Sequence, residues 1–197
     1  MFLLRLFDVG VTTPYTVLTM QRFCASSWEV IKTIAIAGIV VFGIRTFLFQ
    51  PFLVSGASME PNVSQSNYLI IDELTYRFRE PARGEVVVFR YPGDKSTFYI
   101  KRIVGLPNEQ IDIENNFIHI NGVNIDESEY LKGISTIGSV HVKLGSDEYF
   151  VMGDNRSNSY DSRAWGPLKK EYVVGRALLR LFPFNHISIF EEQNYAL

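Results

Sequence analysis

The hydrophobic and polar positions follow two different patterns on either side of Pro51. From residue 28 to residue 50 the chain is a nearly continuous apolar run. A helix of this length would be roughly 34 Å long at 1.5 Å per residue, which is enough to cross a bilayer. Trp28 would lie at one interface, and Arg45 is close enough to the other to reach water. The pattern predicts a single N-terminal transmembrane helix over residues 28–50, preceded by a tail of residues 1–27.

Two other interpretations of the apolar run remain open. The uncharged stretch within it, Thr33–Ile44, is shorter than the roughly 20 residues that a bilayer requires, so a helix buried in a protein core would also fit. A cleaved signal peptide is the other alternative, but the run continues directly into what resembles domain sequence. The flanking charges do not determine the orientation in a membrane, because basic residues lie on both sides.

After Pro51 the pattern changes to short runs rich in β-branched and aromatic residues, separated by Gly, Pro and Asn. Runs that end at such turn residues are typical of strands. Asn121–Gly122 lies between two of them and is the strongest short signal for a hairpin. No helical period separates the runs, so we predict a mostly β fold, an antiparallel sheet or barrel, for a domain of residues 51–197. The predicted strands lie at residues 86–89, 99–104, 117–120, 123–125, 149–152 and 172–181.

Charge and cysteine content exclude several classes of function. The 197 residues carry 19 basic and 21 acidic side chains, and residues 51–197 alone have a net charge of -4. Such a domain lacks the basic face that nucleic acids require, so no nucleic-acid partner is expected. Cys24 is the only cysteine, which rules out a disulfide framework. No metal-ligand spacing and no glycine-rich loop before a helix is present, so neither a metal nor an organic cofactor is expected.

The first candidate for chemistry is Ser58, in the small-residue segment Val54–Pro61 directly after the apolar run. Small side chains allow backbone N–H groups to approach a substrate carbonyl, as an oxyanion hole requires. A plain linker leaving a membrane would have the same composition. The commonest serine chemistry also needs a histidine, but His119, His141 and His186 do not lie beside a serine in a small-residue turn.

The second candidate is Lys101, in the middle of an apolar run. Side chains alternate along a strand, so Lys101 shares a face with Tyr99 and Ile103, whereas Arg102 lies on the other face. One of these two cations is therefore expected to face the interior. A desolvated lysine loses its charge more readily and can then accept the proton of a serine hydroxyl. A lysine at a solvent-exposed sheet edge would show the same alternation with its neighbours. Lys101 and Ser58 are far apart in the sequence, so only the fold could bring them together.

Four segments together resemble bacterial type I signal peptidases. They occur in the order of that family and cover most of residues 45–183, and the last is the most specific. The segments are Ser55–Pro61 (Ser-Gly-Ala-Ser-Met-Glu-Pro), Arg83–Phe89, Tyr99–Gly105 and Gly153–Pro167.

The resemblance implies a membrane-bound serine endopeptidase on a β fold. The family removes N-terminal signal peptides from secretory pre-proteins, typically after Ala-x-Ala. The implied partners are therefore such pre-proteins and the lipid bilayer. The implied location is the cell membrane, crossed once, with the domain of residues 51–197 on the extracytoplasmic side.

The resemblance also implies roles for individual residues. Ser58 matches the position of the nucleophile, and Lys101 matches that of the general base. Ser159 matches a hydroxyl that hydrogen-bonds to the lysine amine and orients it. Asp161 and Arg163 match a charged pair that holds the loop of the last segment in place.

Two positions depart from the usual pattern of this family. Asn62–Val63 follow Pro61, where Thr-Leu is frequent, and Gly56 replaces a serine that often donates its hydroxyl to the oxyanion. The resemblance then implies an oxyanion hole of backbone N–H groups, from Ser58 and Gly56. A specialised relative with a narrow set of substrates, and a membrane-anchored β module without catalytic activity, remain as alternatives.

Overall fold

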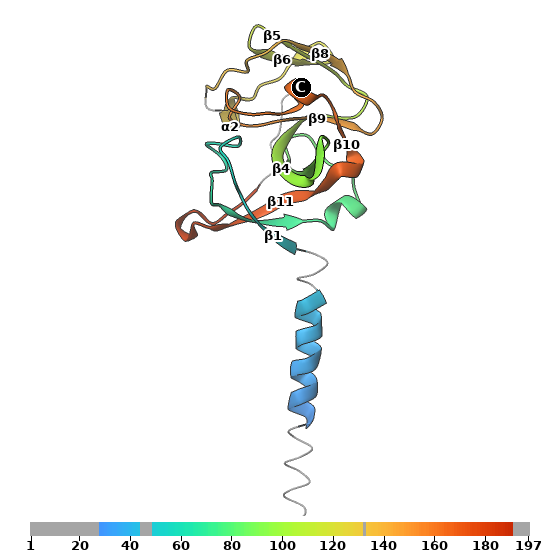
Figure 1. The fold of residues 1–197 in the computed structure, drawn as a ribbon, viewed down its shortest axis with the longest axis vertical. Helices are drawn as coiled ribbons and strands as arrows, with labels where there is room; N and C mark the ends of the chain where they lie inside the picture. The colour runs from blue at the N-terminus through green and yellow to red at the C-terminus, as the bar shows by residue number, and fades with distance from the viewer. Residues whose placement is uncertain (1–27, 44–48, 132, 191–197) are drawn as a thin grey trace, which may run out of the picture. The chain divides into compact units, whose positions relative to one another are not determined.

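The computed structural model describes residues 28–43, 49–131 and 133–190 (Figure 1). The chain divides into two compact units, Met1–Ile44 and Arg45–Leu197. In the first unit residues 28–43 form a helix, nearly all of whose side chains are exposed. The predicted tail of residues 1–27 lies outside the described residues.

The predicted transmembrane helix over residues 28–50 is not confirmed in that form. Residues 44–48 lie outside the described part, and Phe49–Leu53 form strand β1 rather than the end of a helix. Strand β1 pairs antiparallel with β2 (Tyr68–Asp72), which satisfies its backbone, and an edge strand tolerates Pro51. Among the described residues, no helix has both the length and the apolar character needed to cross a bilayer.

The described part of the second unit is built mainly from two antiparallel sheets, which confirms the predicted mostly β fold (Figure 1). In the larger sheet the strand order is β1-β2-β11-β3-β4-β9-β10, and β12 pairs with β11. The strands that complete this sheet are β3 (Val86–Tyr91), β4 (Asp94–Gly105), β9 (Glu148–Met152), β10 (Leu168–Lys169), β11 (Val173–Phe182) and β12 (Ser188–Ile189).

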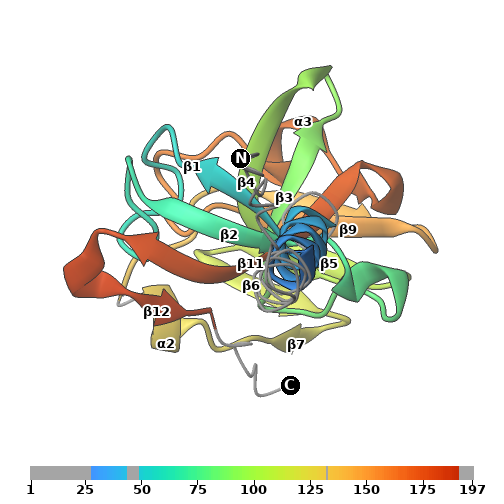
Figure 2. The same cartoon turned by 90° about the horizontal axis from the view of Figure 1, so that it is seen from below.

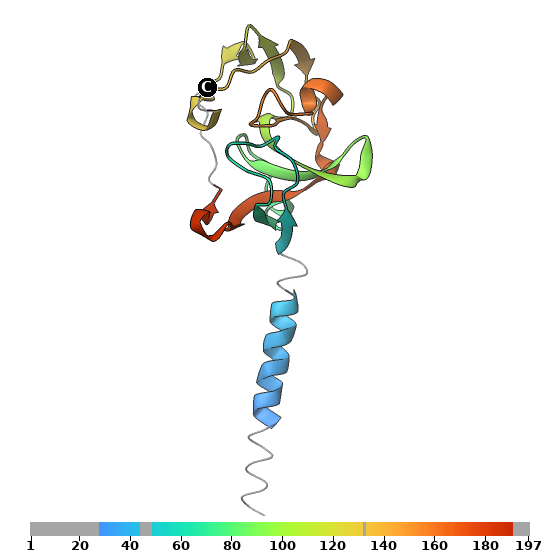
Figure 3. The ribbon, with the colours of Figure 1, turned by 60° about the vertical axis from the view of Figure 1, so that its left-hand side comes forward.

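The smaller sheet lies at one end of the second unit (Figure 3). Its strand order is β7-β6-β5-β8, and its strands are β5 (Gln110–Glu114), β6 (Phe117–Ile120), β7 (Val123–Asn124) and β8 (Val140–Lys143). The predicted hairpin at Asn121–Gly122 connects β6 and β7. Both residues have positive φ, 52° and 84°, as the tightest hairpin turns require.

Short helical turns connect the strands. Two are α-helical, α2 (Ser128–Leu131) and α3 (Ser162–Trp165). Three are 3₁₀ turns, η1 (Thr75–Arg77), η2 (Lys170–Tyr172) and η3 (Phe184–His186). None of these turns presents a long apolar face, so the strands supply most of the core.

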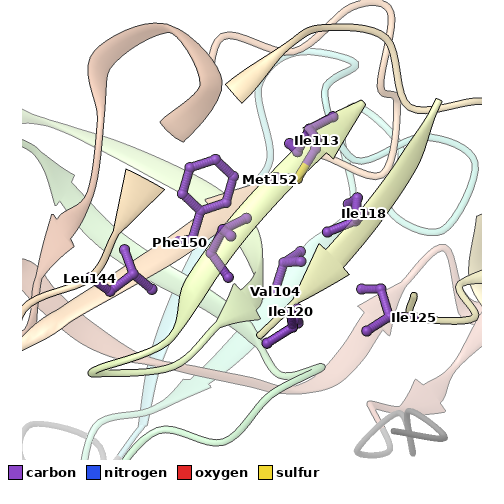
Figure 4. Close-up of a cluster of buried hydrophobic side chains, with 9 residues drawn as sticks. Val104, Ile113, Ile118, Ile120, Ile125, Leu144, Phe150 and Met152 are labelled. Atoms are coloured by element: carbon purple, nitrogen blue, oxygen red, sulfur yellow. The ribbon is translucent and has the colours of Figure 1, made fainter. Parts of the chain in front are cut away.

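Buried apolar side chains form three clusters in the second unit. One lies between the smaller sheet and strands β4 and β9, where Phe150 and Met152 pack against isoleucines of β5 and β6 (Figure 4). The other two lie on the two faces of β3, because Val86 and Val88 belong to one and Val87 and Phe89 to the other. Each large apolar side chain buried in this way contributes about 1.5–3 kcal/mol.

Strand β4 crosses the larger sheet between β3 and β9. Lys101 lies opposite Val87 of β3, and Arg102 lies opposite Val86 on one side and Met152 of β9 on the other. A strand with partners on both edges and packed layers on both faces excludes water from the side chains at its centre. The fold therefore places Lys101 in a region where a charged amine is poorly solvated.

Candidate active site

Ser58 and Lys101 lie in hydrogen-bonding contact, although they are 43 positions apart in the chain. The Lys101 Nζ atom donates to Ser58 Oγ at 2.7 Å and to the carbonyl oxygen of Ile100 at 3.0 Å. Ser58 is in the turn between β1 and β2, whereas Lys101 is in β4. An amine and a hydroxyl at this distance can exchange a proton directly.

Both neighbouring cations of β4 are buried, since Lys101 and Arg102 are each 4% exposed. The prediction that only one of them faces the interior is wrong, because β4 is covered on both of its faces. Burial also excludes the alternative of a solvent-exposed lysine at a sheet edge. Each cation is instead satisfied by its own set of partners.

Burial lowers the pKa of Lys101 to about 8, because desolvation disfavours the ammonium form. The negative charges of Asp161 and Asp154 act in the opposite direction and partly offset the effect of burial. The Tyr99 ring, on the same side of the strand, lies 5.3 Å from Nζ. At a pH near 8, about half of the Lys101 side chains are neutral amines, which can act as a base.

The turn that carries Ser58 is held by the segment after β9. The backbone N–H of Asn155 donates to the Ser58 carbonyl oxygen at 3.0 Å, and its side-chain amide donates to the Ala57 carbonyl oxygen at 3.1 Å. On the other side of Ser58, the Met59 side chain is 1% exposed and packs in the core. Ser58 itself remains partly exposed between these two anchors.

Gly153 lies against this turn so closely that no larger residue fits. A Cβ atom at position 153 would lie 2.4 Å from the Ser58 carbonyl oxygen and 2.3 Å from Ser159 Oγ. Both distances are far shorter than a van der Waals contact. The glycine therefore lets the last segment and the serine turn approach each other.

Asp161 and Arg163 form a bidentate ion pair at the start of α3. The Nε and Nη2 atoms of Arg163 donate to Asp161 at 2.8 and 2.9 Å, and Nη2 also donates to the Arg156 carbonyl oxygen at 2.7 Å. Asp161 is fully buried and accepts the N–H of Gly153 at 3.0 Å. Burial would raise the pKa of Asp161, but the guanidinium and these hydrogen bonds hold it below its usual value. The pair ties both ends of the loop together.

Ser159 does not make the hydrogen bond to the lysine amine that the resemblance implies. Its Oγ atom is buried and has no hydrogen bond of normal geometry among the described residues. The Lys101 amine is bound by Ser58 and Ile100 instead. Ser159 faces Gly153 and lies near Asp161, whose pKa it helps to lower.

A second buried ion pair beside Lys101 was missed by sequence reasoning. Arg102 donates through Nε and Nη2 to Asp154 at 2.8 and 2.7 Å, and through Nη1 to the Gly84 carbonyl oxygen at 2.7 Å. Asn62 also donates to Asp154, at 2.8 Å. The available signal was the arginine itself, because a cation inside an apolar strand requires a carboxylate, and Asp154 lies in the most specific segment.

A third buried pair ties the same loop to the segment around α2. Arg156 donates to the two carboxylate oxygens of Glu127 at 2.7 and 2.5 Å, and to the Gly153 carbonyl oxygen at 3.1 Å. Thr136 and Tyr130 complete the partners of this guanidinium. Every buried charge of the loop is therefore compensated, as a charge removed from water requires.

A pocket of about 300 Å³ opens beside Ser58 and Lys101. Most of its lining is apolar, with the hydroxyl of Ser58 and the amine of Lys101 among its few polar groups. The other lining residues are Phe52, Leu53, Val54, Ser55, Gly56, Leu69, Val88, Phe98, Tyr99, Ile100 and Tyr160. Such a concave apolar site with a few polar groups is typical of a substrate site.

The backbone at Gly56 and Ser58 also borders this pocket. Gly56 has φ of +103°, a conformation that favours glycine, and the space beside its Cα is open. Within the described residues, the N–H groups of Gly56 and Ser58 donate no hydrogen bond. These two donors are free to bind a ligand in the pocket.

The described residues contain no group of three or more His, Cys, Asp or Glu side chains that could hold a metal ion. None of the three histidines is among the described residues that line the pocket beside Ser58. His119 and His141 are in the smaller sheet, and His186 is in η3.

Comparison with known proteins identifies the family. The model of the family described as signal peptidase, peptidase S26, matches residues 27–182. The chain belongs to this family. The resemblance to bacterial type I signal peptidases is thereby confirmed, and the chain is a signal peptidase, a serine endopeptidase.

Two sequence relatives agree with this assignment. The chain is 37% identical to "Probable signal peptidase I-2" of Synechocystis sp., over 85% of this chain and 79% of that protein. It is 39% identical to "Signal peptidase I P" of Bacillus subtilis subsp. natto, over 80% of this chain and 90% of that protein. A crystal structure of a signal peptidase I from Enterococcus faecalis V583 matches at 29% identity, with a TM-score of 0.45, over 50% of this chain and 97% of that one.

Proposed function

We propose that this signal peptidase cleaves its substrates with Ser58 as the nucleophile and Lys101 as the general base. The observation that carries the proposal is the 2.7 Å hydrogen bond between Lys101 Nζ and Ser58 Oγ, with the pKa of the lysine lowered to about 8. A serine hydroxyl is a weak nucleophile until an adjacent base removes its proton. Lysine can be that base only where burial removes its charge, which an arginine does not lose.

The proposed reaction has two halves. In the first, Ser58 Oγ attacks the scissile carbonyl carbon while its proton passes to Lys101, and the protonated amine then donates a proton to the leaving amine. This step leaves an acyl-enzyme ester on Ser58. In the second, a water molecule attacks the ester as Lys101 accepts its proton, and Ser58 is released with its own proton restored.

The negative oxygen that develops in each half needs donors in the right place. The free N–H groups of Ser58 and Gly56 support the proposal that these two form the oxyanion hole. Backbone donors have fixed positions and need no rearrangement when the charge appears. The open space beside the Cα of Gly56 leaves room for the substrate carbonyl.

The apolar pocket supports cleavage after small residues, of the Ala-x-Ala type. Its volume of about 300 Å³ has to hold both the backbone and the side chains of a substrate, which favours small side chains. Residues Tyr99–Lys101 of β4 and the segment Leu53–Gly56 both line it. An extended peptide can lie between such segments as an added strand.

We also propose that the chain acts at the cell membrane, with the domain of residues 51–197 on the extracytoplasmic side. Support comes from the helix of residues 28–43, whose apolar side chains are exposed, as in Ile34, Ile39 and Phe42. Lipid would cover these side chains favourably. A tether would also raise the effective concentration of enzyme and membrane-held pre-protein.

The test is to incubate the purified chain in detergent with a secretory pre-protein whose signal ends in Ala-x-Ala, and to read the product termini by mass spectrometry. Cleavage directly after the second alanine supports the proposal, and replacing that alanine by leucine should abolish it. Cleavage restricted to a few pre-proteins would favour the specialised relative. Binding of the pre-protein without cleavage would favour the silent β module and contradict the proposal.

A further inference from the structure

A second pocket, of about 370 Å³, lies in the second unit and shares no lining residue with the pocket beside Ser58. It is formed by the loop before β2 and by the end of β11 with the turn that follows. Its lining residues are Pro61, Ser64, Gln65, Ser66, Asn67, Arg180, Phe182, Pro183 and His186. Among the described residues, the lining includes an arginine and a histidine but no carboxylate.

Arg180 is the unusual residue of this pocket. Its Nη2 atom donates to the Asn62 carbonyl oxygen, its Nε atom is buried without a partner, and its guanidinium lies 5.6 Å from the Phe190 ring centre. In the described part of the chain, Arg180 has no carboxylate within ion-pair distance. The arginines around the catalytic loop, such as Arg102 and Arg163, are all paired with acids. A half-buried guanidinium that has no acid partner among the described residues can bind an external anion through charge-assisted hydrogen bonds.

The other polar groups of the pocket are donors that suit an anion with several oxygens. His186 carries a ring N–H in either charge state, and Ser64 and Ser66 carry hydroxyls. Gln65 can add a side-chain amide. Phosphate oxygens are favoured ligands for such a set, because arginine can bind two of them at once.

Exposed apolar side chains surround the same pocket. Phe182 lines it, and the adjoining hairpin presents Phe184, Ile187 and Ile189, which are 77%, 56% and 68% exposed. Strands β11 and β12 form this hairpin side by side (Figure 2). Large apolar side chains that are exposed beside a cationic pocket suit a ligand with a charged head and an apolar body.

We propose that this pocket binds the phosphate group of an anionic phospholipid, with Arg180 and His186 on the phosphate and the apolar hairpin against the acyl chains. The charge complementarity comes from the Arg180 guanidinium, which has no carboxylate partner among the described residues, and the apolar contact comes from Phe182, Phe184 and Ile187. The site does not depend on the reaction at Ser58.

The test uses the full chain in detergent and isothermal titration calorimetry with three soluble probes: dioctanoyl phosphatidylglycerol, dioctanoyl phosphatidylcholine and inorganic phosphate. We expect saturable binding of phosphatidylglycerol, with phosphatidylcholine and inorganic phosphate each at least about tenfold weaker. Arg180→Gln should weaken phosphatidylglycerol binding by about tenfold or more, as expected for loss of a charge-assisted contact. Arg77→Gln removes an arginine of η1 outside the pocket and should change nothing.

Three results would overturn the proposal. Equal affinity for the two lipids would show that the negative charge is not recognised. Inorganic phosphate binding as tightly as phosphatidylglycerol would show that no lipid is needed. Unchanged binding in Arg180→Gln would show that the pocket is not the site. If Arg180→Gln does not fold, His186→Ala replaces it, and unchanged phosphatidylglycerol binding in that variant would also show that the pocket is not the site.

Discussion

The backbone N–H of Asn155 is hydrogen-bonded to the carbonyl oxygen of Ser58 at 3.0 Å, and the Asn155 side chain binds the preceding carbonyl of Ala57. The position of the serine is thus set by a loop far along the chain. The same loop carries Asp154 and Asp161, which face Arg102 and the Gly153 N–H. The geometry of the Ser58/Lys101 pair therefore depends on the whole loop rather than on two residues.

Replacing the Asn155 side chain should loosen the serine turn without unfolding the domain. Asn155→Ala removes the bond to the Ala57 carbonyl oxygen and keeps the backbone bond to Ser58. A lost hydrogen bond of about 1 kcal/mol predicts roughly a fivefold fall in kcat/KM. Steady-state kinetics on a peptide substrate measure it. Asn158→Ala, at an exposed position of the same loop, is the control and should keep full activity; equal activity of the two variants would contradict this account.

Adding one methyl group at Gly153 should displace the serine. The new Cβ of Gly153→Ala would meet the Ser58 carbonyl oxygen at 2.4 Å, so the turn must move. Because a shift of about 1 Å can cost 10²-fold in rate, we expect a fall in kcat/KM of that order. Gly145→Ala is the matched control, since its Cβ would meet only the flexible side chain of Glu148, at 3.1 Å. Near-normal activity of Gly153→Ala would show that the close approach has no catalytic role.

The rate of cleavage should follow the titration of Lys101. With a pKa of about 8, the active neutral amine is the minor form below that pH and the major form above it. We expect kcat/KM of the free enzyme to rise about tenfold per pH unit below 8 and to level off above it. A pH–rate profile from pH 6 to 10 measures this. A profile that is flat between pH 6 and 9 would be inconsistent with a lysine base.

The same titration should appear in stability. Unfolded lysine keeps its proton up to about pH 10.5, whereas folded Lys101 releases it near pH 8, so the unfolded state binds more protons between these values. Wild-type stability therefore rises with pH through this window, by about 3 kcal/mol for the fall in pKa. Lys101→Met removes this pH dependence. The stability of the variant minus that of wild type should therefore be about 3 kcal/mol larger at pH 7 than at pH 10.5.

Urea unfolding of both proteins at the two pH values measures this difference. Lys169→Met, at an exposed position of β10, is the control and should show the same difference from wild type at both pH values. A pH-independent difference for Lys101→Met would mean that the pKa of Lys101 is not lowered.

Much of the fold and of the site could be predicted from the sequence. The alternation around Lys101 and the small residues around Ser58 are local patterns, and the Asn121–Gly122 turn is specified by its own two residues. The structures that these three patterns predict depend little on the rest of the chain. That Ser58 and Lys101 act together was predicted from the resemblance in four segments, because their spacing in the sequence alone does not indicate it.

The parts that were missed depend on what packs against each segment. Phe49 and Gln50 fit the end of a helix and the start of a strand alike, and only the pairing of β1 with β2 distinguishes the two. The alternation rule allowed one buried cation in β4, but layers on both faces bury Lys101 and Arg102 together. The partner of Arg102, Asp154, is 52 positions away, so no local pattern reveals it.

The most direct test of the central claim is cleavage by Lys101→Arg, measured beside Ser58→Ala and wild type on the same Ala-x-Ala pre-protein. Arginine keeps a cation at this position but cannot give up its proton to become a base. Circular dichroism would establish that each variant is folded. The account predicts no detectable cleavage by either folded variant. Cleavage by folded Lys101→Arg at a rate near that of wild type would contradict it.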